Sequence, residues 1–366
     1  MRRYLVFISS FLGFYLLNGQ ETYASNGDSY YIKGIVGRGS GNVKGVESNS
    51  MWGMGLGWSH DLHSSRQEWP KIVNAKAINV GFIYNNFQGM EVGGVTFGES
   101  YGVQSQVEIG LIEKENFNLR AVPGIGLGYM TKTTFTDETF YIFGTHINGL
   151  FTADLKANYR FNNHLGVFAS IGFTHYSNGS FKIPNAGINT LNATLGLTYR
   201  PNPTKVSSKD SLITTKDEVK TNATEWIVGV GRRGRYKEHK GFFRMGFYGG
   251  YTHFFNSVLG IRAGIDAVYY DQVYDPKVYE DTIPYWGRSY DHWRWGLSVG
   301  GEAKMNKVGI VANLGYYLHL DSPTHQKLYW NTSVKYYLQP QWGVQIMLNA
   351  HKFQADFVNW GLFVRI

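Results

Sequence analysis

A histidine and a serine stand two positions apart at the end of an alternating apolar segment, and such a pair can do nucleophilic chemistry. They are His175 and Ser177, and the segment before them starts at Leu165. A serine hydroxyl is a poor nucleophile until a base removes its proton, and the base works best when a third group fixes its tautomer. The amide oxygen of Asn189 could accept a hydrogen bond from the imidazole. These residue types suit the hydrolysis of an ester.

The two segments that carry these residues alternate with a period of two, which is the side-chain period of a β-strand. One face of the first segment carries Leu165, Val167, Ala169, Ile171, Phe173, His175 and Ser177. One face of the second carries Asn189, Leu191, Ala193, Leu195, Leu197 and Tyr199. Folded as an antiparallel pair, the segments place His175, Ser177 and Asn189 on one apolar face near the same end. Positions two apart on a strand have Cβ atoms about 6.5–7 Å apart, so the polar atoms of His175 and Ser177 can meet.

The connection between these segments holds further groups that could stabilise negative charge on a reacting carbonyl. The side chains of Asn178 and Asn185 and the backbone around Gly179 are close enough in sequence to supply hydrogen-bond donors. Such donors form the oxyanion hole of an acyl-transfer enzyme. We therefore take His175, Ser177 and Asn189 as candidate catalytic residues, and Asn178, Gly179 and Asn185 as residues that shape the site.

The elements that must position this site are short strands of a membrane barrel. The chain has 366 residues with 45 glycines, 26 tyrosines, no cysteine and 17% charged residues, a composition that suits many short strands. Most segments set apolar residues on one face against Gly, Thr and Gln on the other, as in an outer-membrane β-barrel whose apolar face meets lipid. Eight strands are predicted before residue 200, centred on Tyr30–Arg38, Met51–Trp58, Ala77–Phe87, Tyr101–Ile112, Phe117–Met130, Thr139–Phe161, Leu165–Ser177 and Ile188–Arg200.

The second half of the chain repeats the first. The stretch from Ile32 to Gly39 resembles that from Ile227 to Gly234, and roughly eight more strands fit between Trp226 and Ile366. A polar segment, 201–225, lacks periodicity and reads as a linker. The sequence predicts tandem eight-stranded antiparallel transmembrane barrels, with one sixteen-stranded barrel as the alternative. The second unit is expected to be chemically silent, because His351 falls on the inward face of its seventh strand.

The N-terminus predicts export. Arg2 and Arg3 precede an apolar run from Tyr4 to Leu17 and a plausible cleavage point near Ala24, the pattern of a secretory signal peptide. The expected organisation is a signal peptide over 1–24, a catalytic barrel over 25–200, the linker over 201–225 and a degenerate second barrel over 226–366. The expected location is the bacterial outer membrane.

The polarity of the strands predicts which end carries the site. If both termini of the first unit lie in the periplasm, its seventh strand ends at the cell surface. The short connection before Leu165 is then a periplasmic turn, and the longer 178–187 segment is an external loop, as is usual for these barrels. His175 and Ser177 would therefore face the outer leaflet, where an ester still embedded in the bilayer could reach them.

The motif formed by His175, Ser177, Asn178, Gly179, Asn185 and Asn189 resembles that of the outer-membrane lipid A 3-O-deacylase (PagL-type) family of acyloxyacyl hydrolases. The resemblance covers roughly residues 28–200, with the tight match confined to 173–189, and the second half resembles extended members of the group. It implies Ser177 as nucleophile, His175 as general base and Asn185 as oxyanion donor, with Asn178 shaping the turn. The family commonly has a glutamate where this chain has Asn189, and a neutral amide stabilises an imidazolium less well.

The expected activity is that of a carboxylic ester hydrolase acting on an ester-linked acyl chain of lipid A in lipopolysaccharide. Two alternatives remain open: a non-catalytic structural or porin-like barrel, and an outer-membrane phospholipase. Calcium-loop, phosphate-loop and zinc-ligand spacings are missing from the sequence, so no cofactor or metal is implied. The expected partners are lipid A and outer-membrane lipids, with no nucleic acid. The sequence leaves the oligomeric state open.

Overall fold

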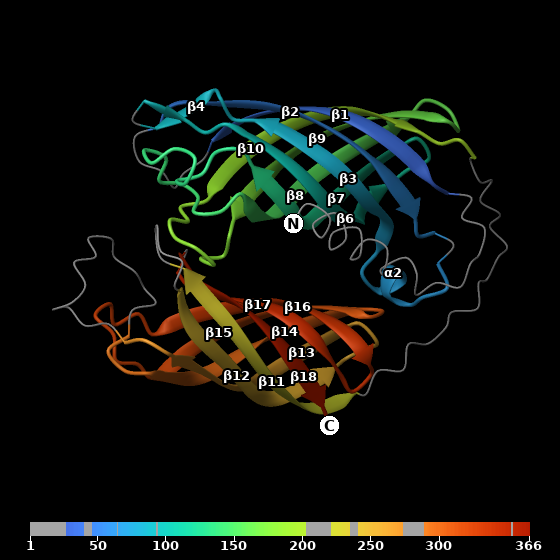
Figure 1. The fold of residues 1–366 in the computed structure, drawn as a ribbon. Helices are drawn as coiled ribbons and strands as arrows, with labels where there is room; N and C mark the ends of the chain where they lie inside the picture. The colour runs from blue at the N-terminus through green and yellow to red at the C-terminus, as the bar shows by residue number, and fades with distance from the viewer. Residues whose placement is uncertain are drawn as a thin grey trace. The chain divides into compact units, whose positions relative to one another are not determined.

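In the computed structural model, strands make up nearly all of the regular structure. The structure describes residues 27–39, 46–63, 65–92, 94–202, 221–234, 241–273, 289–352 and 354–366. The predicted signal peptide lies outside the described residues. The described chain forms two compact units, one built on β1–β10 and the other on β11–β18 (Figure 1). Among the described helices, none has the length and apolar character needed to cross a bilayer.

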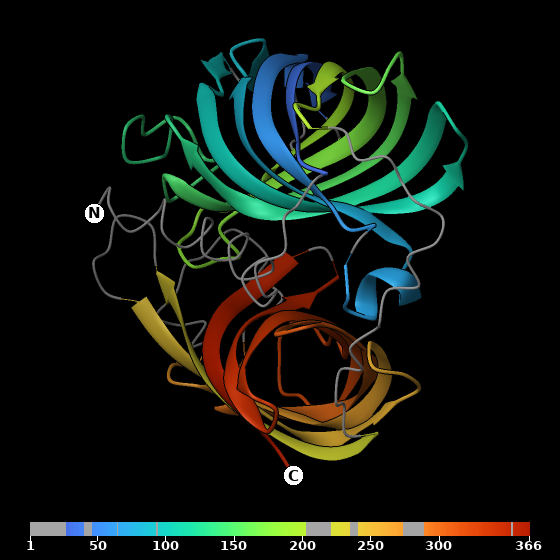
Figure 2. The same cartoon turned by 90° about the vertical axis from the view of Figure 1, so that its right-hand side faces the viewer.

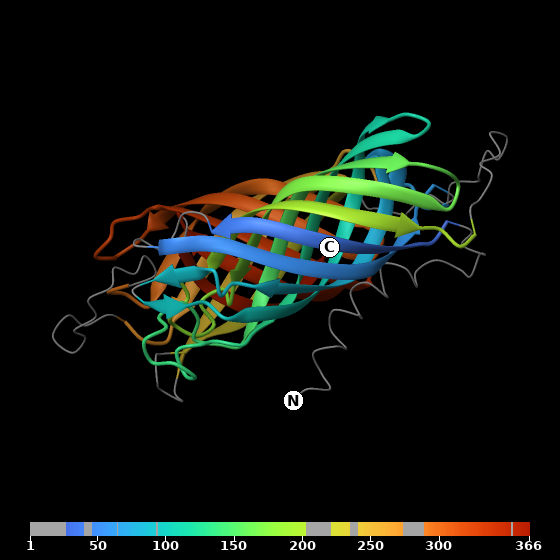
Figure 3. The same cartoon turned by 90° about the horizontal axis from the view of Figure 1, so that it is seen from above.

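The first unit is an eight-stranded antiparallel barrel. Its last long strand returns to its first, because β1 pairs with both β10 and β2: Ile32 lies opposite Leu197 on one side and Leu56 on the other. Figure 3 shows β1, in blue, beside the yellow-green β10. The eight long strands are β1 (Ser29–Gly39), β2 (Val46–Asp61), β3 (Ala75–Asn86), β6 (Glu99–Glu113), β7 (Phe117–Met130), β8 (Ile147–Arg160), β9 (Leu165–Ser177) and β10 (Ile188–Tyr199). Shorter elements are α2 (Trp69–Ile72), β4 (Met90–Val92) and β5 (Val95–Thr96).

The second unit closes in the same way. Its first strand pairs with its second and its last, with Val228 opposite Phe247 and Leu362. Figure 2 shows this barrel end-on. Its strands are β11 (Asn222–Gly234), β12 (Gly241–Phe254), β13 (Leu259–Tyr270), β14 (Trp293–Met305), β15 (Val308–His319), β16 (Leu328–Gln339), β17 (Trp342–His351) and β18 (Gln354–Arg365).

The prediction of tandem eight-stranded barrels is confirmed, and the sixteen-stranded alternative is wrong, because each half closes on itself. The repeated sequences also occupy equivalent places, since Ile32 lies in β1 and Ile227 in β11, the first strand of each ring. Each barrel thereby satisfies the backbone hydrogen bonds of its edge strands internally, which a membrane-spanning sheet requires.

The alternation seen in the sequence separates an outer apolar surface from an inner polar one. On the outward rows, Ile171 is 65% exposed and Leu195 is 64% exposed. On the inward rows, Gln104 and Thr152 are almost fully buried. A water-soluble protein would bury the apolar face, whereas a membrane barrel directs it to lipid. The distribution is that of a membrane barrel.

The predicted strand Thr139–Phe161 is wrong at its start, because β8 begins only at Ile147. The preceding residues bury side chains without alternation: Phe140, Ile142 and Phe143 all join the apolar cluster that contains Tyr176. Three apolar residues within four positions look like strand residues in sequence. Here they belong to a loop that folds back onto the barrel.

The predicted linker 201–225 is also too long, because β11 begins at Asn222, inside that range. Residues 203–220 lie outside the described part of the chain. The reason for the error is Glu225, a charged residue that reads as linker but points into the second barrel, where its carboxylate is fully buried. The interior of this barrel supplies the cations that its charge requires.

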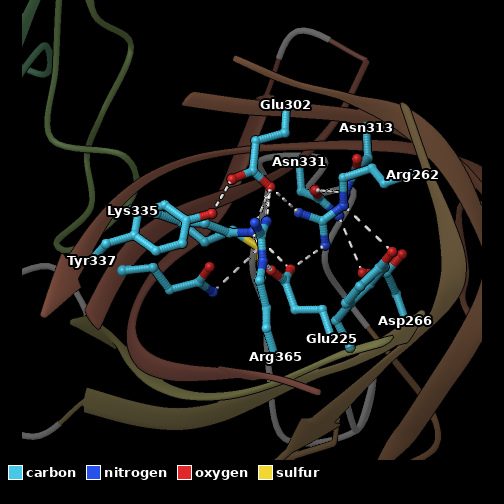
Figure 4. Close-up of polar contacts among 12 residues, drawn as sticks. Glu225, Arg262, Asp266, Glu302, Asn313, Asn331, Lys335, Tyr337 and Arg365 are labelled. Atoms are coloured by element: carbon cyan, nitrogen blue, oxygen red, sulfur yellow. Dashed lines mark hydrogen bonds and ion pairs between the residues drawn. The ribbon is translucent and has the colours of Figure 1, made fainter. Parts of the chain in front are cut away.

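Side chains fill the interiors of both barrels, as expected for eight strands. In the first, the Glu108 carboxylate accepts from Arg120 Nη1 and Lys156 Nζ, both at 2.7 Å. In the second, Lys335 Nζ lies 2.7 Å from Glu225 and 2.9 Å from Glu302 (Figure 4). Charges buried this deeply are tolerated only when they are paired.

Lys335 gives a stability prediction for the second barrel. The change Lys335→Met keeps most of the side-chain length but leaves the Glu225 and Glu302 carboxylates without this shared, fully buried cation. Arg262 and Arg365 still contact the two carboxylates, so we expect the free energy of unfolding to fall by about 1–3 kcal/mol, the cost of removing hydrogen bonds from buried charged groups. Urea titration of the folded barrel in detergent, followed by gel mobility, measures the change. The control is Lys307→Met, in an exposed turn; equal stability of the two variants would contradict the prediction.

Candidate active site

The end of β9 presents both candidate residues, His175 and Ser177, on the outer side of the barrel wall. His175 and Ser177 continue the outward row of Ile171 and Phe173, whereas Tyr176 between them points inward and is fully buried. The imidazole and the hydroxyl therefore share the lipid-facing side of the first barrel, near the end of the strand. The alternation of the sequence predicts this placement.

Tyr176 fixes this part of the strand from inside. Its hydroxyl oxygen accepts from Asn85 Nδ2 at 2.8 Å and lies 3.1 Å from Ser100 Oγ. Its ring meets that of Phe87 edge to face, with the ring centres 5.9 Å apart. Buried hydrogen bonds and packing of this kind hold a side chain in one rotamer. Because the neighbouring residues are thereby held, His175 and Ser177 have a defined outward orientation.

His175 and Asn189 form a direct cross-strand pair. They lie opposite each other in the β9–β10 register, where side chains on one face approach closely. His175 Nδ1 is 2.5 Å from Asn189 Oδ1. An amide oxygen only accepts, so Nδ1 carries the proton and Nε2 has the lone pair of a base. The imidazole also stacks on Phe173, with the ring planes 7° apart.

Asn185 joins the loop after β9 to the serine. Its Nδ2 donates to Ser177 Oγ at 2.8 Å, and its Oδ1 accepts from the backbone N–H of Asn178 at 3.0 Å. The second contact fixes the orientation of the amide, so that the NH₂ group faces the serine. This directs a neutral donor to the region where charge would develop during attack on a carbonyl.

Two glycines give the 178–187 connection its shape. Gly179 has φ +63° and Gly187 has φ +75°. Both lie in the left-handed region, which glycine adopts readily because it has no Cβ to clash with the backbone. Gly187 is also tightly placed, because a Cβ there would lie 3.0 Å from Tyr176 O and 3.1 Å from His175 Cε1. A side chain at position 187 would therefore press on the imidazole.

A second loop, residues 131–146, supports the first and was missed by sequence reasoning. Gly144 N–H donates to Pro184 O at 2.7 Å, and Ala186 N–H donates to Ile142 O at 2.9 Å. Thr145 Oγ1 accepts from Asn178 Nδ2 at 3.0 Å. These bonds bracket Asn185 on both sides and hold it beside Ser177. These bonds could not be predicted from the sequence, because residues 139–146 have the apolar character of a strand.

An apolar groove lies on the outward face beside the site. It has a volume of about 790 Å³ and crosses β1, β10, β9 and β8. Phe173, which stacks on His175, forms part of its wall, so the groove reaches the candidate base. The outward side chains of the groove are Val36, Arg38, Ala153, Leu155, Ile171, Phe173, Leu191 and Ala193.

The seventh strand of the second barrel carries no equivalent pair in its described residues. His351 is buried inside the barrel, and its Nε2 lies 3.1 Å from the Tyr317 hydroxyl. The outward positions of β17 include Trp342 and Val344, which are apolar. The outward site therefore belongs to the first barrel, in agreement with the expectation for His351.

Closed barrels with apolar outer faces and filled interiors define the class: the chain is a bacterial outer-membrane β-barrel protein. Comparison with protein families identifies the family. Residues 52–198 match the family described as lipid A 3-O-deacylase (PagL), and residues 222–366 match the acyloxyacyl hydrolase C-terminal domain. The chain belongs to the lipid A 3-O-deacylase family and has a second, C-terminal barrel.

Solved structures resemble the chain only distantly. Neisserial surface protein A is 8% identical, with a TM-score of 0.29, over 48% of this chain and 99% of that one. The Pseudomonas putida toluene transporter TodX is 11% identical, with a TM-score of 0.18, over 93% and 90%. No curated protein matches the sequence. The fold assignment rests on the strand pairing and not on these likenesses.

Proposed function

We propose that the first barrel is a serine esterase that hydrolyses an ester-linked acyl chain of lipid A at the outer leaflet. Ser177 is the nucleophile, His175 the general base, and Asn189 the residue that orients the imidazole. The observation that carries the proposal is the outward His175–Asn189 pair at 2.5 Å, with Ser177 next on the same face. Membership of the lipid A 3-O-deacylase family supports the substrate class.

The reaction follows from the protonation state of the imidazole. His175 Nε2 accepts the proton of the Ser177 hydroxyl as Oγ attacks the ester carbonyl, and catalytic contacts of this kind tighten when substrate binds. The tetrahedral intermediate carries its negative charge on the former carbonyl oxygen, toward which Asn185 Nδ2 can donate. Collapse expels the sugar alkoxide, which takes the proton from the imidazolium. Water, activated by the same base, then releases the fatty acid from the acyl-serine and restores the hydroxyl.

Asn189 makes this chain different from family members with an acidic residue at that position. Its oxygen holds the Nδ1–H tautomer, which is the form needed for Nε2 to act as a base. It brings no negative charge to stabilise the imidazolium that forms after proton transfer. We infer that orientation, not charge, is the contribution of Asn189.

The groove provides a place for the departing acyl chain. Its outward side chains are mostly aliphatic, it lies on the lipid-facing surface, and it reaches the imidazole through Phe173. An acyl chain in this groove would remain within the apolar layer while its ester lies at the end of β9. The loop lengths support placing this end at the cell surface, because residues 161–164 form a short turn before β9 and residues 178–187 a longer connection after it.

The experiment that tests the function uses the purified full chain in a neutral detergent. Lipid A is added, and mass spectrometry follows the lipid and the free fatty acid. The proposal predicts loss of one ester-linked acyl chain and release of one fatty acid per lipid A. A parallel incubation with diacyl phospholipid tests the phospholipase alternative. Release from phospholipid but not from lipid A, or release from neither, would contradict the proposal.

Asn185 gives a prediction for the oxyanion donor. The change Asn185→Ala removes the amide that donates to Ser177 Oγ and accepts from Asn178 N–H. We expect kcat for fatty-acid release to fall about 10²- to 10³-fold, as when a single oxyanion donor is removed. Initial rates at saturating lipid A measure the loss. The control is Asn192→Ala, because Asn192 bonds Thr174 on the inward side; a rate within a factor of three of wild type for Asn185→Ala would contradict the role.

A further inference from the structure

One charged side chain stands in the otherwise uncharged groove. Arg38 is exposed on the outward face of β1 and lines the groove. Among the strands that form the groove, β1, β8, β9 and β10, no other Lys or Arg lies on the outward row. A cation at a lipid-facing position is costly unless it reaches the interface or meets an anion. This position therefore needs an explanation.

The strand register connects Arg38 to the site. Arg38 lies opposite Leu191 of β10, and Leu191 lies opposite Phe173 of β9. Phe173 stacks on His175, which is the next outward position along β9. Two strand spacings and a few residue steps separate Arg38 from Ser177. Their Cα atoms are therefore on the order of 16 Å apart, and the Arg38 side chain bonds Asn49 on β2, on the other side of β1 from β10.

The guanidinium retains donors for a ligand. Arg38 Nε donates to Asn49 Oδ1 at 3.1 Å, which is the hydrogen bond that its side chain makes within the described residues. The bond holds the base of the guanidinium, and the terminal Nη groups are the part that can form a fork around an anion. Arginine binds phosphate in this bidentate way, whereas lysine acts as a point charge.

We propose that Arg38 binds a phosphate of the glycolipid substrate and so determines which esters reach Ser177. The inference rests on the proposed function of the first barrel. Lipid A is a phosphorylated glycolipid, and a sugar headgroup spans a distance of the same order as the separation between Arg38 and Ser177. With its phosphate on Arg38 and its acyl chain in the groove, the substrate would be held at two points. The ester would then be placed at the end of β9.

The test compares two substrates, lipid A and the same lipid after enzymatic removal of its phosphates, in neutral detergent. The variants are Arg38→Gln, Arg38→Lys and the control Arg160→Gln, which makes the same change at the other end of the barrel, where β8 pairs with the start of β9. In Arg38→Gln, we expect the ratio of kcat/KM for the phosphorylated over the dephosphorylated lipid to fall about tenfold. Arg38→Lys should retain part of the ratio, and Arg160→Gln all of it. An unchanged ratio in Arg38→Gln would overturn the proposal.

A binding measurement separates this inference from the proposed function. The Ser177→Ala protein, with and without Arg38→Gln, is titrated with each lipid. We expect Arg38→Gln to raise the Kd for phosphorylated lipid A about tenfold more than the Kd for the dephosphorylated lipid. If the wild-type protein releases no fatty acid but this difference in Kd is found, the esterase proposal fails and the role of Arg38 stands. Equal effects on both Kd values would refute the role of Arg38.

Discussion

Replacing Ser177 with alanine is expected to abolish fatty-acid release from lipid A and leave the barrel folded. The change removes the oxygen that forms the acyl-enzyme in the proposed reaction, and losses on the order of 10⁴-fold or more are usual when such a nucleophile is deleted. The fold should tolerate the change because Ser177 lies on the outward face at the last position of β9. Release of fatty acid is measured by mass spectrometry, and folding by heat-dependent gel mobility.

The matched control for this variant is Ser105→Ala. Ser105 is an outward serine on β6, two strands away from β8, and its cross-strand partners are Val80 and Ile125. It should release fatty acid at the wild-type rate. If Ser177→Ala keeps more than a tenth of the wild-type rate while folded, Ser177 is not the nucleophile.

Replacing His175 with alanine should lower kcat about 10³- to 10⁴-fold. The change removes the imidazole that takes the serine proton in the proposed reaction, and with it the partner of Asn189 at 2.5 Å. The outward position predicts an intact barrel, because Tyr176 still anchors β9 through Asn85. The rate of fatty-acid release is the readout, and added imidazole should restore part of it by occupying the space of the lost ring.

A second histidine provides the control. His60 is also bonded to a neighbouring side chain, with its Nδ1 2.8 Å from Asp28 Oδ1, but it lies at the opposite end of the first barrel. His60→Ala should retain wild-type kcat. A His175→Ala protein that works at the wild-type rate, or a His60→Ala protein that loses activity to the same extent, would place the base elsewhere.

Sequence alone predicted the strands that carry the site because a lipid-facing barrel has a strict two-residue alternation. The predicted bounds Phe117–Met130 and Leu165–Ser177 agree with β7 and β9. The pairing of His175 with Asn189 could also be anticipated, since both residues end apolar rows on neighbouring strands. In a closed barrel, neighbours in sequence are neighbours in the sheet, so long-range contacts between strands become predictable.

The structural features that could not be predicted depend on contacts that leave no periodic pattern in the sequence. The 131–146 loop buries Phe140 and Phe143 side by side against the barrel, so its apolar residues imitate a strand. Thr145 meets Asn178 across a separation of 33 residues, and nothing in either local sequence signals this bond. Glu225 resembles a linker residue in sequence because the partners that neutralise its charge, Arg262, Lys335 and Arg365, lie far along the chain.

The groove also had no signal in the sequence. It includes short outward side chains on the two strands that flank β9: Ala153 of β8 lies opposite Phe173, and Ala193 of β10 lies opposite Ile171. Each of these residues is ordinary in its own strand. Only the register, which brings Leu191 beside both Arg38 and Phe173, shows that together they form one depression next to the imidazole.

The central claim is that a lipid-facing serine attacks an ester, and covalent trapping tests it most directly. The purified full chain in detergent is treated with a long-chain alkyl phosphonofluoridate, digested, and analysed by tandem mass spectrometry. The account predicts one phosphonyl group per chain, attached to Ser177 Oγ, with the labelling rate lowered at least a hundredfold in His175→Ala. Labelling of another residue, or no labelling of Ser177 in a protein that releases fatty acid from lipid A, would contradict it.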